Sequence, residues 1–365
     1  MPAAEETAAG GRITRSRHPM DAPRLQRFDG NPILAPTSRW WENRWVFNCG
    51  ATLYQNRVVL LYRAQGADWV SRFGLAVLED GVRVVERSPR PVFEPALNNP
   101  WERLGVEDPR VTFLDGRYFI CYTAASLYPA LRPVRRRGPS PFDDNGVPWR
   151  TRIAIATTRD FVLFRRVGLA FRQWDDKNGA LFPARIRGRY YLLHRIFPNI
   201  HLGTSLDLRR WRDLGPILTV RPGSWDSNRI GPGVPPLWTP YGWLLFYHGV
   251  DDSRVYRLGV ALLDLEHPRH VLARAPNPIL EPEEPYEREG LVPNVVFTCG
   301  AVELGDRYFV YYGAADSVIG VASVSRQALL QWAADAARTA PSVPARLIRA
   351  ARREAYEVAR HRRTG

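Results

Sequence analysis

The sequence predicts an all-β protein, specifically a five-bladed β-propeller with a helical extension at its C-terminal end. One observation is composition: of 365 residues, 12% are aromatic, and the chain holds 31 prolines and 28 glycines. This mixture favours many short strands joined by tight turns. The second observation is an internal repeat, in which a turn is followed by an apolar, aromatic strand. The repeat occurs at residues 56–64, 116–124, 188–196, 242–250 and 306–314.

Each repeat is followed by a second strand-like segment. These segments are residues 73–77, 152–156, 201–205, 256–261 and 318–322. The repeats start about 54 to 72 residues apart, which suits one four-stranded sheet with its loops. Because such sheets cannot each bury both faces alone, we expect five of them to stack around an axis. The propeller is expected to span residues 28–325.

The two ends of the chain do not contain this turn–strand repeat. Residues 1–27 are expected to form a flexible leader, and residues 326–365 a basic helical extension. Residues 327–337 have a helical pattern, and a second apolar face lies within 347–358. We expect the extension to pack on the flank of the propeller or on a second subunit, which would make a homo-oligomer. A helix on a membrane surface is a weaker alternative, because large aromatic anchors are missing.

The net charge of +14 raises nucleic acid or an anionic substrate as a partner. The basic residues are nearly all arginine, the one lysine being Lys177, and many lie near the ends or in residues 132–137. No pattern typical of a nucleic-acid-binding module accompanies them, so no nucleic-acid partner is expected. No apolar run reaches the roughly 18 residues of a membrane span, so no membrane partner is expected either.

The three cysteines are Cys49, Cys121 and Cys299. They are too few for a disulfide scaffold, and no pair has the spacing of a structural zinc site. The start of the chain also lacks the apolar core of a signal peptide. We therefore expect a reducing, cytoplasmic location, small buried cysteines rather than a disulfide, and no metal.

A ring of polar residues is predicted where the innermost strands begin, near the central channel. The segments before the five repeats are residues 47–50, 105–110, 176–183, 229–236 and 291–297. Asp108 is the most distinctive group in them. Pro109 is expected to favour an extended backbone at Asp108, and burial among aromatic groups to raise the carboxyl pKa, as a general acid requires. The alternative is a structural carboxylate, the role expected for Glu107 through Arg110 or backbone donors.

Several of these segments together resemble glycoside hydrolase family 130, which comprises β-mannoside phosphorylases and related β-1,2-mannosidases. They are residues 106–110, 177–183, 230–236, 247–250, 256–264, 292–297 and 311–316. The resemblance runs from about residue 31 to 325. It implies an inverting reaction on a β-mannoside, with Asp108 as proton donor. Cleavage by inorganic phosphate would give α-mannose 1-phosphate, with no cofactor, and the reverse reaction would build the bond.

The resemblance also assigns the two sides of the pocket. Lys177, Arg195, His248 and Tyr256 match the family positions that bind phosphate, which needs only positive charge and donors to hold it. Asn48, Arg63 and Asp316 match positions that bind the mannosyl unit, although an arginine and an aspartate at strand ends could equally form a structural pair. Aromatic candidates for stacking on sugar are Tyr122, Phe182, Trp225 and Tyr312, with the alternative that these rings belong to the core.

Two other functions stay open at this point. A hydrolase of the same fold would need a second carboxylate to activate water, such as Glu289 or Asp252. A non-catalytic sugar-binding or nucleic-acid-binding propeller is the other alternative. The segment 126–150 is longer than the family leads us to expect and lies in the unit that carries Asp108. The acceptor sugar is therefore left open.

Overall fold

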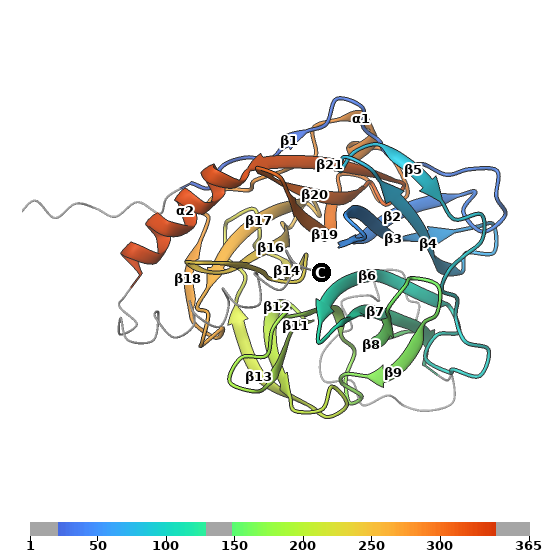
Figure 1. Ribbon diagram of the computed structural model, residues 1–365, viewed down its shortest axis with the longest axis horizontal. Coiled ribbons are helices and arrows are strands. Elements are labelled where there is room, and N and C mark those ends of the chain that lie inside the picture. The colour runs from blue at the N-terminus through green and yellow to red at the C-terminus, as the bar shows by residue number, and fades with distance from the viewer. Residues whose placement is uncertain (1–20, 129–147, 341–365) are drawn as a thin grey trace, which may run out of the picture.

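The computed structural model describes residues 21–128 and 148–340, and this part of the chain is built mostly of antiparallel strands. We divide the strands into five units, numbered in chain order, which stand around a common centre (Figure 1). Unit one contains β2 (Trp45–Tyr54), β3 (Arg57–Gln65), β4 (Ser71–Leu78) and β5 (Val84–Arg87). Unit two contains β6 (Gly105–Leu114), β7 (Arg117–Leu127), β8 (Trp149–Thr158) and β9 (Arg165–Leu169).

The other three units follow the same order. Unit three contains β10 (Lys177–Leu181), β11 (Tyr190–Ile196), β12 (Asn199–Ser205) and β13 (Trp211–Leu218). Unit four contains β14 (Arg229–Pro232), β15 (Leu237–Thr239), β16 (Gly242–Val250), β17 (Tyr256–Leu263) and β18 (Val271–Arg274). Unit five contains β19 (Val296–Leu304), β20 (Arg307–Ala314), β21 (Val318–Ser325) and, from the start of the described chain, β1 (Gln26–Arg27).

The five repeated segments form the expected hairpin strands. They are β3, β7, β11, β16 and β20, each paired antiparallel with the next strand, β4, β8, β12, β17 or β21. Residues with positive φ precede several of them, including Asn56 (59°), Gly116 (72°) and Gly188 (74°). Asparagine and glycine tolerate this left-handed backbone in tight turns. The repeat read from the sequence is thus confirmed at the level of strands and hairpins.

The first strands β6, β14 and β19 lie beside the centre of the molecule (Figure 1). β19 contacts β2, β2 contacts β6, β6 contacts β10, and β10 contacts β14. Units one and two also share a short parallel pair, Ser71 with Gly105. A Cβ atom on Gly105 would lie 2.7 Å from the Ser71 backbone, so this close approach requires glycine. Residues at the start of the first strands therefore converge from several units.

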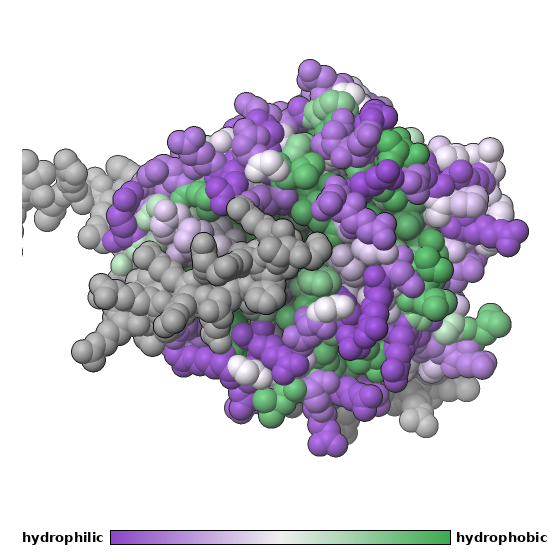
Figure 2. Space-filling view, in the orientation of Figure 1, coloured by the Kyte–Doolittle hydropathy of each residue, from purple (hydrophilic) through white to green (hydrophobic). Residues whose placement is uncertain are grey.

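The last strands of the units are partly exposed, as the burial of β5, β9, β13 and β18 shows. Hydrophilic side chains accordingly cover much of the periphery in the space-filling view (Figure 2). The apolar core lies between neighbouring sheets instead. One such cluster combines Phe246 and Val260 of unit four with Val310 and Tyr312 of unit five.

Four units contain the same buried polar arrangement, which we call the carboxylate–Tyr–Arg set. A carboxylate that precedes the first strand accepts hydrogen bonds from a tyrosine of the repeated strand (β3, β7, β16 or β20) and from an arginine of the outermost strand. The sets are Glu42 with Tyr62 and Arg87, Glu102 with Tyr122 and Arg166, Asp226 with Tyr247 and Arg274, and Glu287 with Tyr312 and Arg27. In each set the buried carboxylate links the segment before the first strand to the repeated strand and the outermost strand of the same unit.

These sets correct the expectation that certain aromatic residues stack on sugar. Tyr122 and Tyr312 belong to the sets and are buried. Phe182 packs in the core against Trp243, and Trp225 stacks on Tyr247. Each of the four rings therefore packs against protein side chains, as expected for aromatic residues of the core.

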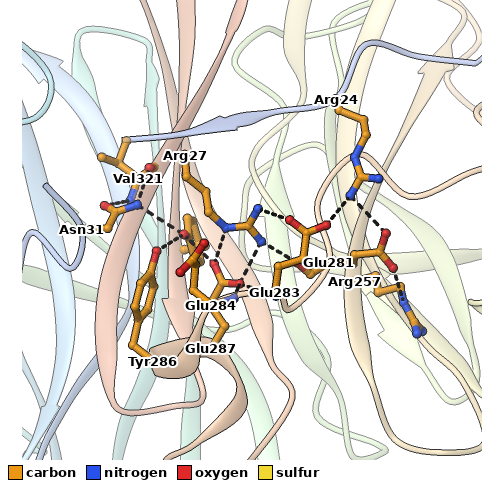
Figure 3. A network of polar contacts seen from close by, with 11 residues as sticks. Arg24, Arg27, Asn31, Arg257, Glu281, Glu283, Glu284, Tyr286, Glu287 and Val321 are labelled. Atoms are coloured by element: carbon orange, nitrogen blue, oxygen red, sulfur yellow. Dashed lines mark hydrogen bonds and ion pairs between the residues drawn. The ribbon is translucent and has the colours of Figure 1, made fainter. Parts of the chain in front are cut away.

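The N-terminal strand β1 completes the sheet of unit five. Gln26 and Arg27, assigned from the sequence to the leader, pair with Ser323 and Ala322 of β21. Arg27 donates to both oxygens of Glu287, each at 2.8 Å, and forms an ion pair with Glu283 at 2.7 Å (Figure 3). Residues 26 and 27 are thus part of the folded sheet, and residues 1–20 lie outside the described residues.

Loss of the Arg27 guanidinium should destabilise the fold measurably. Glu287 is fully buried, and Arg27→Ala leaves its charge without the cation that offsets burial. We expect a loss of about 1–3 kcal/mol in the free energy of unfolding, measured by urea denaturation. Arg24→Ala is the matched control, because Arg24 pairs with Glu281 and Glu283 while 55% exposed. That control should cost less than about 1 kcal/mol, and equal losses would contradict the role given to Arg27.

The helix α2 (Arg326–Thr339) confirms a helix at the start of the expected extension. Ser325 caps it by accepting a hydrogen bond from the Ala328 amide. Leu329, Trp332 and Ala333 pack it on the core shared by units four and five. The second expected stretch, residues 347–358, lies outside the described residues. The other helix, α1 (Pro285–Arg288), is a single turn before β19.

Two further expectations concern cysteines and membranes. Cys49, Cys121 and Cys299 are buried and unpaired, so the prediction of small buried thiols is confirmed. Among residues 21–128 and 148–340, neither helix has the length and apolar character needed to cross a bilayer.

Candidate active site

Three first strands bend at the same level near the centre of the molecule. The bend occurs at Asn48 in β2, Asp108 in β6 and Asn178 in β10, whose φ angles are 45°, 52° and 60°. The pairing register shifts at each position, as in a β-bulge, which re-aims a side chain out of the ladder. The extended backbone expected at Asp108 is therefore wrong. Asp108 is left-handed at this bulge, and aspartate and asparagine tolerate that conformation better than most residues.

Asp108 and Arg63 form the centre of the polar cluster. Asp108 Oδ1 accepts hydrogen bonds from Asn48 Nδ2 at 3.0 Å and from Arg63 Nη1 at 3.1 Å. Arg63 also donates to Glu107 Oε1 at 2.7 Å and to Ser71 Oγ at 2.9 Å, and its guanidinium lies over the Phe47 ring. Both contacts of Asp108 fall on one oxygen, so Oδ2 makes no hydrogen bond within the described part of the chain.

The charges around Asp108 reverse the pKa shift expected from the sequence. Burial raises the pKa of the Asp108 carboxyl, but the positive charges of Arg63, Lys177 and Arg110 together hold it below its ordinary value. The expectation of a raised pKa is therefore wrong for the protein without substrate. The expectation from the sequence included the desolvation but not these cations, of which Arg63 and Lys177 come from other strands and Arg110 lies two residues along β6.

Asp316 lies in the same field with the opposite result. Burial raises its pKa to about 7, because the favourable charge of Arg63 is countered by the repulsion of Asp108 and Glu107. Its backbone is left-handed, with φ at 49°. Asp108 and Asp316 are thus two carboxyl groups of one cluster whose pKa values are moved apart, a pattern typical of catalytic sites.

This shift predicts a pH effect on stability. The folded pKa of Asp316 is about 7 against an ordinary 3.8, so between these values the folded state binds more protons than the unfolded state. The free energy of unfolding contributed by Asp316 therefore falls as pH rises from about 4 to 7. Asp316→Asn should remove this fall, so the variant gains stability relative to wild type across that window. Urea unfolding at several pH values measures it.

The control for this experiment is Asp252→Asn, since Asp252 is an exposed aspartate outside the cluster. Its pH profile of stability should run parallel to that of wild type. A parallel profile for Asp316→Asn as well would mean that Asp316 does not carry the shift.

Glu107 has different partners from those expected. It pairs with Arg63 and lies 3.8 Å from Lys177 Nζ. Arg110 instead donates to the carbonyl oxygens of Gly233 at 2.6 Å and Pro232 at 3.0 Å. The guanidinium of Arg110 therefore ties the second unit to the fourth, while Glu107 balances the cations of the pocket.

The first two predicted phosphate ligands are neighbours on adjacent strands. Lys177 on β10 and Arg195 on β11 are paired across the ladder. Burial lowers the pKa of Lys177, against the raising effect of Glu107 and Asp108. Burial also lowers the pKa of Arg195 to about 10, partly offset by Tyr256 and reinforced by Arg229. Both cations are desolvated, which strengthens their attraction for an anion.

The other two predicted ligands lie beside Arg195. The rings of His248 and Tyr256 are stacked with centroids 6.2 Å apart, and His248 also packs on Phe297. His248 Nε2 is 3.4 Å from Asn178 Nδ2. Burial, reinforced by the charges of Arg195, Arg110 and Arg229, holds the His248 pKa well below its ordinary value. The imidazole is therefore neutral at physiological pH.

Arg229 is a member of this cluster that the sequence did not single out. It donates to the Tyr256 hydroxyl at 2.8 Å and lies over the same ring. The available signal was its position, since it begins the polar segment 229–236. Asn178 was missed as well, although it follows Lys177 directly.

The two carboxylates considered for a hydrolase are both exposed. Asp252 accepts hydrogen bonds from Ser227 and Asn228 at 3.4 Å, and Glu289 lies at the end of α1. Asp108 and Glu107, by contrast, are buried in the polar cluster. The exposure of Asp252 and Glu289 does not favour either one as the base that activates water.

Comparison with known proteins fits this geometry. The model of glycoside hydrolase family 130, described as beta-1,4-mannooligosaccharide phosphorylase, matches residues 18–135 and 148–335. The chain belongs to this family. Among curated family relatives, a 1,2-beta-oligomannan phosphorylase of Thermoanaerobacter sp. (strain X514) is 40% identical over 310 residues, covering 82% of this chain and 96% of that protein.

Two more relatives point the same way. A beta-1,2-mannobiose phosphorylase of the same Thermoanaerobacter strain is 40% identical over 319 residues, covering 83% of this chain and 98% of that protein. The solved beta-1,2-mannobiose phosphorylase of Listeria innocua, in complex with beta-1,2-mannobiose, superposes with a TM-score of 0.72 at 28% identity. That match covers 85% of this chain and 99% of the solved one.

Proposed function

We propose that the protein is an inverting β-mannoside phosphorylase built on a five-bladed β-propeller, and that its substrate is a β-1,2-linked mannobiose or longer β-1,2-mannooligosaccharide. The observation that carries the activity is the position of two desolvated cations, Lys177 and Arg195, in one polar cluster with Asp108. The linkage rests on the names of the relatives at 40% identity. The propeller rests on five similar units around a centre.

In this mechanism Asp108 gives its proton to the glycosidic oxygen while that oxygen leaves the anomeric carbon. A phosphate oxygen attacks the same carbon from the opposite face, so the products are α-mannose 1-phosphate and a mannoside one unit shorter, or free mannose from the disaccharide. Asn48, Arg63 and Asp316 would hold the mannosyl unit. Lys177 and Arg195 would offset the phosphate charge, and neutral His248 and Tyr256 would supply directional hydrogen bonds.

Asp108 must be protonated to act as the acid, although its pKa is lowered in the free site. We propose that phosphate binding favours the protonated form. Lys177 is one of the cations that lower the Asp108 pKa in the free site. A bound phosphate carries about −1.5 to −2 charge at neutral pH, close to its second pKa of about 6. It would offset much of that positive field, so the Asp108 pKa would rise once phosphate is bound. The acid form would then be favoured only when the nucleophile is in place.

The test is incubation of the purified protein with β-1,2-mannobiose, with and without phosphate. Mannose 1-phosphate should form only with phosphate, in equal amount to mannose, and NMR should show the α anomer. Two mannose units released at a rate independent of phosphate would establish the hydrolase instead. Sugar binding without turnover in either condition would establish a non-catalytic propeller.

Two remaining features are proposals of the same kind. A reducing, cytoplasmic location is favoured by three buried, unpaired cysteines. A homo-oligomer through the C-terminal helices would have to use the outer surface of α2 or later residues, because Leu329 and Trp332 already pack on this chain's own core.

A further inference from the structure

Unit three breaks the carboxylate–Tyr–Arg pattern that the other four units share. In those units the tyrosine pairs across the ladder with a small residue on the next strand. The pairs are Tyr62 with Gly74, Tyr122 with Ala154, Tyr247 with Gly259, and Tyr312 with Gly320. The arginine pairs with the residue two positions after the small one. These arginines are Arg87, Arg166, Arg274 and Arg27.

The same register in unit three brings together different chemistry. His194 takes the tyrosine position, and its cross-strand partner is His201. Two positions on, Gly203 pairs with Asp213, which takes the arginine position. Asp176 takes the position of the buried carboxylate. All three changed positions therefore hold side chains that can bind a metal ion.

Steric space explains why the changes occur together. A Cβ atom on Gly74 would lie 2.2 Å from the Tyr62 ring, and one on Gly259 would lie 2.6 Å from Tyr247. The tyrosine thus requires a small residue opposite. The smaller imidazole of His194 leaves room for His201, whose ring lies with its centroid 5.6 Å away.

Charge separates unit three from the others more sharply. Each carboxylate–Tyr–Arg set offsets its carboxylate with a guanidinium, and in units one and four a second arginine, Arg39 or Arg221, pairs with the same carboxylate. Unit three has two carboxylates, Asp176 and Asp213, and lacks the arginine. Burial lowers the pKa of His194, but these carboxylates raise it to about 9, and a proton on His194 would offset one of the two charges. A dication bound by neutral imidazoles would offset both.

The distances suit a tetrahedral ion. His194 Nε2 lies 3.3 Å from Asp213 Oδ1, and His201 Nδ1 lies 3.2 Å from the same oxygen. The three ligand atoms lie within 4.8 Å of one another. Zinc bound tetrahedrally at about 2.0–2.1 Å places its ligands about 3.3 Å apart. The two distances to Asp213 already have this value.

The surroundings of His194 orient it as a ligand. Its Nδ1 donates to Asp176 Oδ2 at 2.7 Å, which leaves Nε2 to face Asp213 and His201. Such a carboxylate behind a ligand histidine fixes the ring and its tautomer. Phe171 stacks on the ring at 4.3 Å. His194 is fully buried, and Nε2 lacks hydrogen-bond geometry to any partner in the described residues.

We propose that His194 Nε2, His201 Nδ1 and a carboxylate oxygen of Asp213 bind one zinc-type divalent cation, with Asp176 as the supporting carboxylate. Asp213 and His201 are partly exposed, so solvent can supply the fourth ligand. The expectation of no metal considered cysteine ligands and does not cover this site. The ion would hold β11, β12 and β13 together next to Arg195. It would take no part in the mannoside reaction.

The test uses full-length, tag-free protein that has been treated with a chelator. Titration with Zn²⁺ at pH 8 should give one site per chain and raise the unfolding midpoint by a few degrees. Co²⁺ should give the intense visible absorption of a tetrahedral N/O site. The sharpest variant is the triple change His194→Tyr, His201→Gly and Asp213→Arg, which installs the set of the other units.

The triple variant should fold, lose the Co²⁺ absorption and show no rise in midpoint with Zn²⁺. If the triple variant does not fold, Asp213→Asn takes its place, after circular dichroism has shown that it folds. Asp213→Asn should weaken Zn²⁺ binding at least tenfold. The proposal would be overturned if Zn²⁺ did not change the unfolding midpoint of the wild-type protein and Co²⁺ gave no tetrahedral absorption. A proton on His194 would then be the occupant. Binding that persists unchanged in a folded variant would overturn it too.

Discussion

Asp108→Asn is expected to lower kcat for phosphorolysis of β-1,2-mannobiose by about 10²- to 10⁴-fold. Asn48 and Arg63 both donate to Oδ1, and an amide oxygen can accept the same two hydrogen bonds. The pocket should therefore keep its shape and lose the transferable proton. Initial rates of mannose 1-phosphate formation measure the effect, and KM should change little.

A substrate with an acidic leaving group is the internal control for this variant. An aryl β-mannoside needs little protonation of its leaving oxygen, so the variant should lose much less activity on it than on the disaccharide. Asp115→Asn, at an exposed ion pair with Arg185, controls for the substitution itself. Turnover of unactivated mannobiose near the wild-type rate would show that Asp108 is not the acid.

The second large effect is expected at Lys177. Lys177→Ala should weaken the use of phosphate by roughly 2 to 4 kcal/mol, as for the loss of one partner of a desolvated charge pair. This corresponds to about 30- to 1000-fold in kcat/KM for phosphate, at 1.36 kcal/mol per tenfold. The affinity for the mannoside should change far less. The measurement is the rate of mannose 1-phosphate formation against phosphate concentration.

Lys177→Ala has a second signature in its pH profile. Lys177 lowers the Asp108 pKa, so removing its charge should raise that pKa and shift the alkaline limb of kcat/KM to higher pH. Arg185→Ala is the control, because Arg185 is a half-exposed cation outside the cluster. An unchanged phosphate dependence in Lys177→Ala would remove this lysine from the phosphate site.

The sequence predicts what is local and repeated, and less of what depends on distant strands. The hairpins could be predicted because a turn and an apolar strand recur in each unit. The bulge at Asp108 could not, since Pro109 gave a local reason for an extended backbone and the competing register constraint comes from β7. The partners of Glu107 were missed because Arg63 and Lys177 come from two other units.

The candidate site shows the same division. Seven of the eight site residues predicted from the sequence lie on strands, and Asp316 lies in the turn between β20 and β21. The pKa direction at Asp108 required the positions of Arg63, Lys177 and Arg110 in space. The third unit's departure from the carboxylate–Tyr–Arg pattern was equally hidden, since it shows only when ladder registers are compared.

The pairing of β1 with β21 has a consequence for how the chain folds during synthesis. Arg27 leaves the ribosome early, but its partner Glu287 is 260 residues further along. Until β21 has been made, β1 has no sheet to join. Loop closure over such a length costs little more at equilibrium than closure of a shorter loop, because the cost grows only logarithmically. It does slow the search, since contacts distant in sequence form late. The first four units can therefore assemble as translation proceeds, and the fifth must wait for both ends of the sheet to meet.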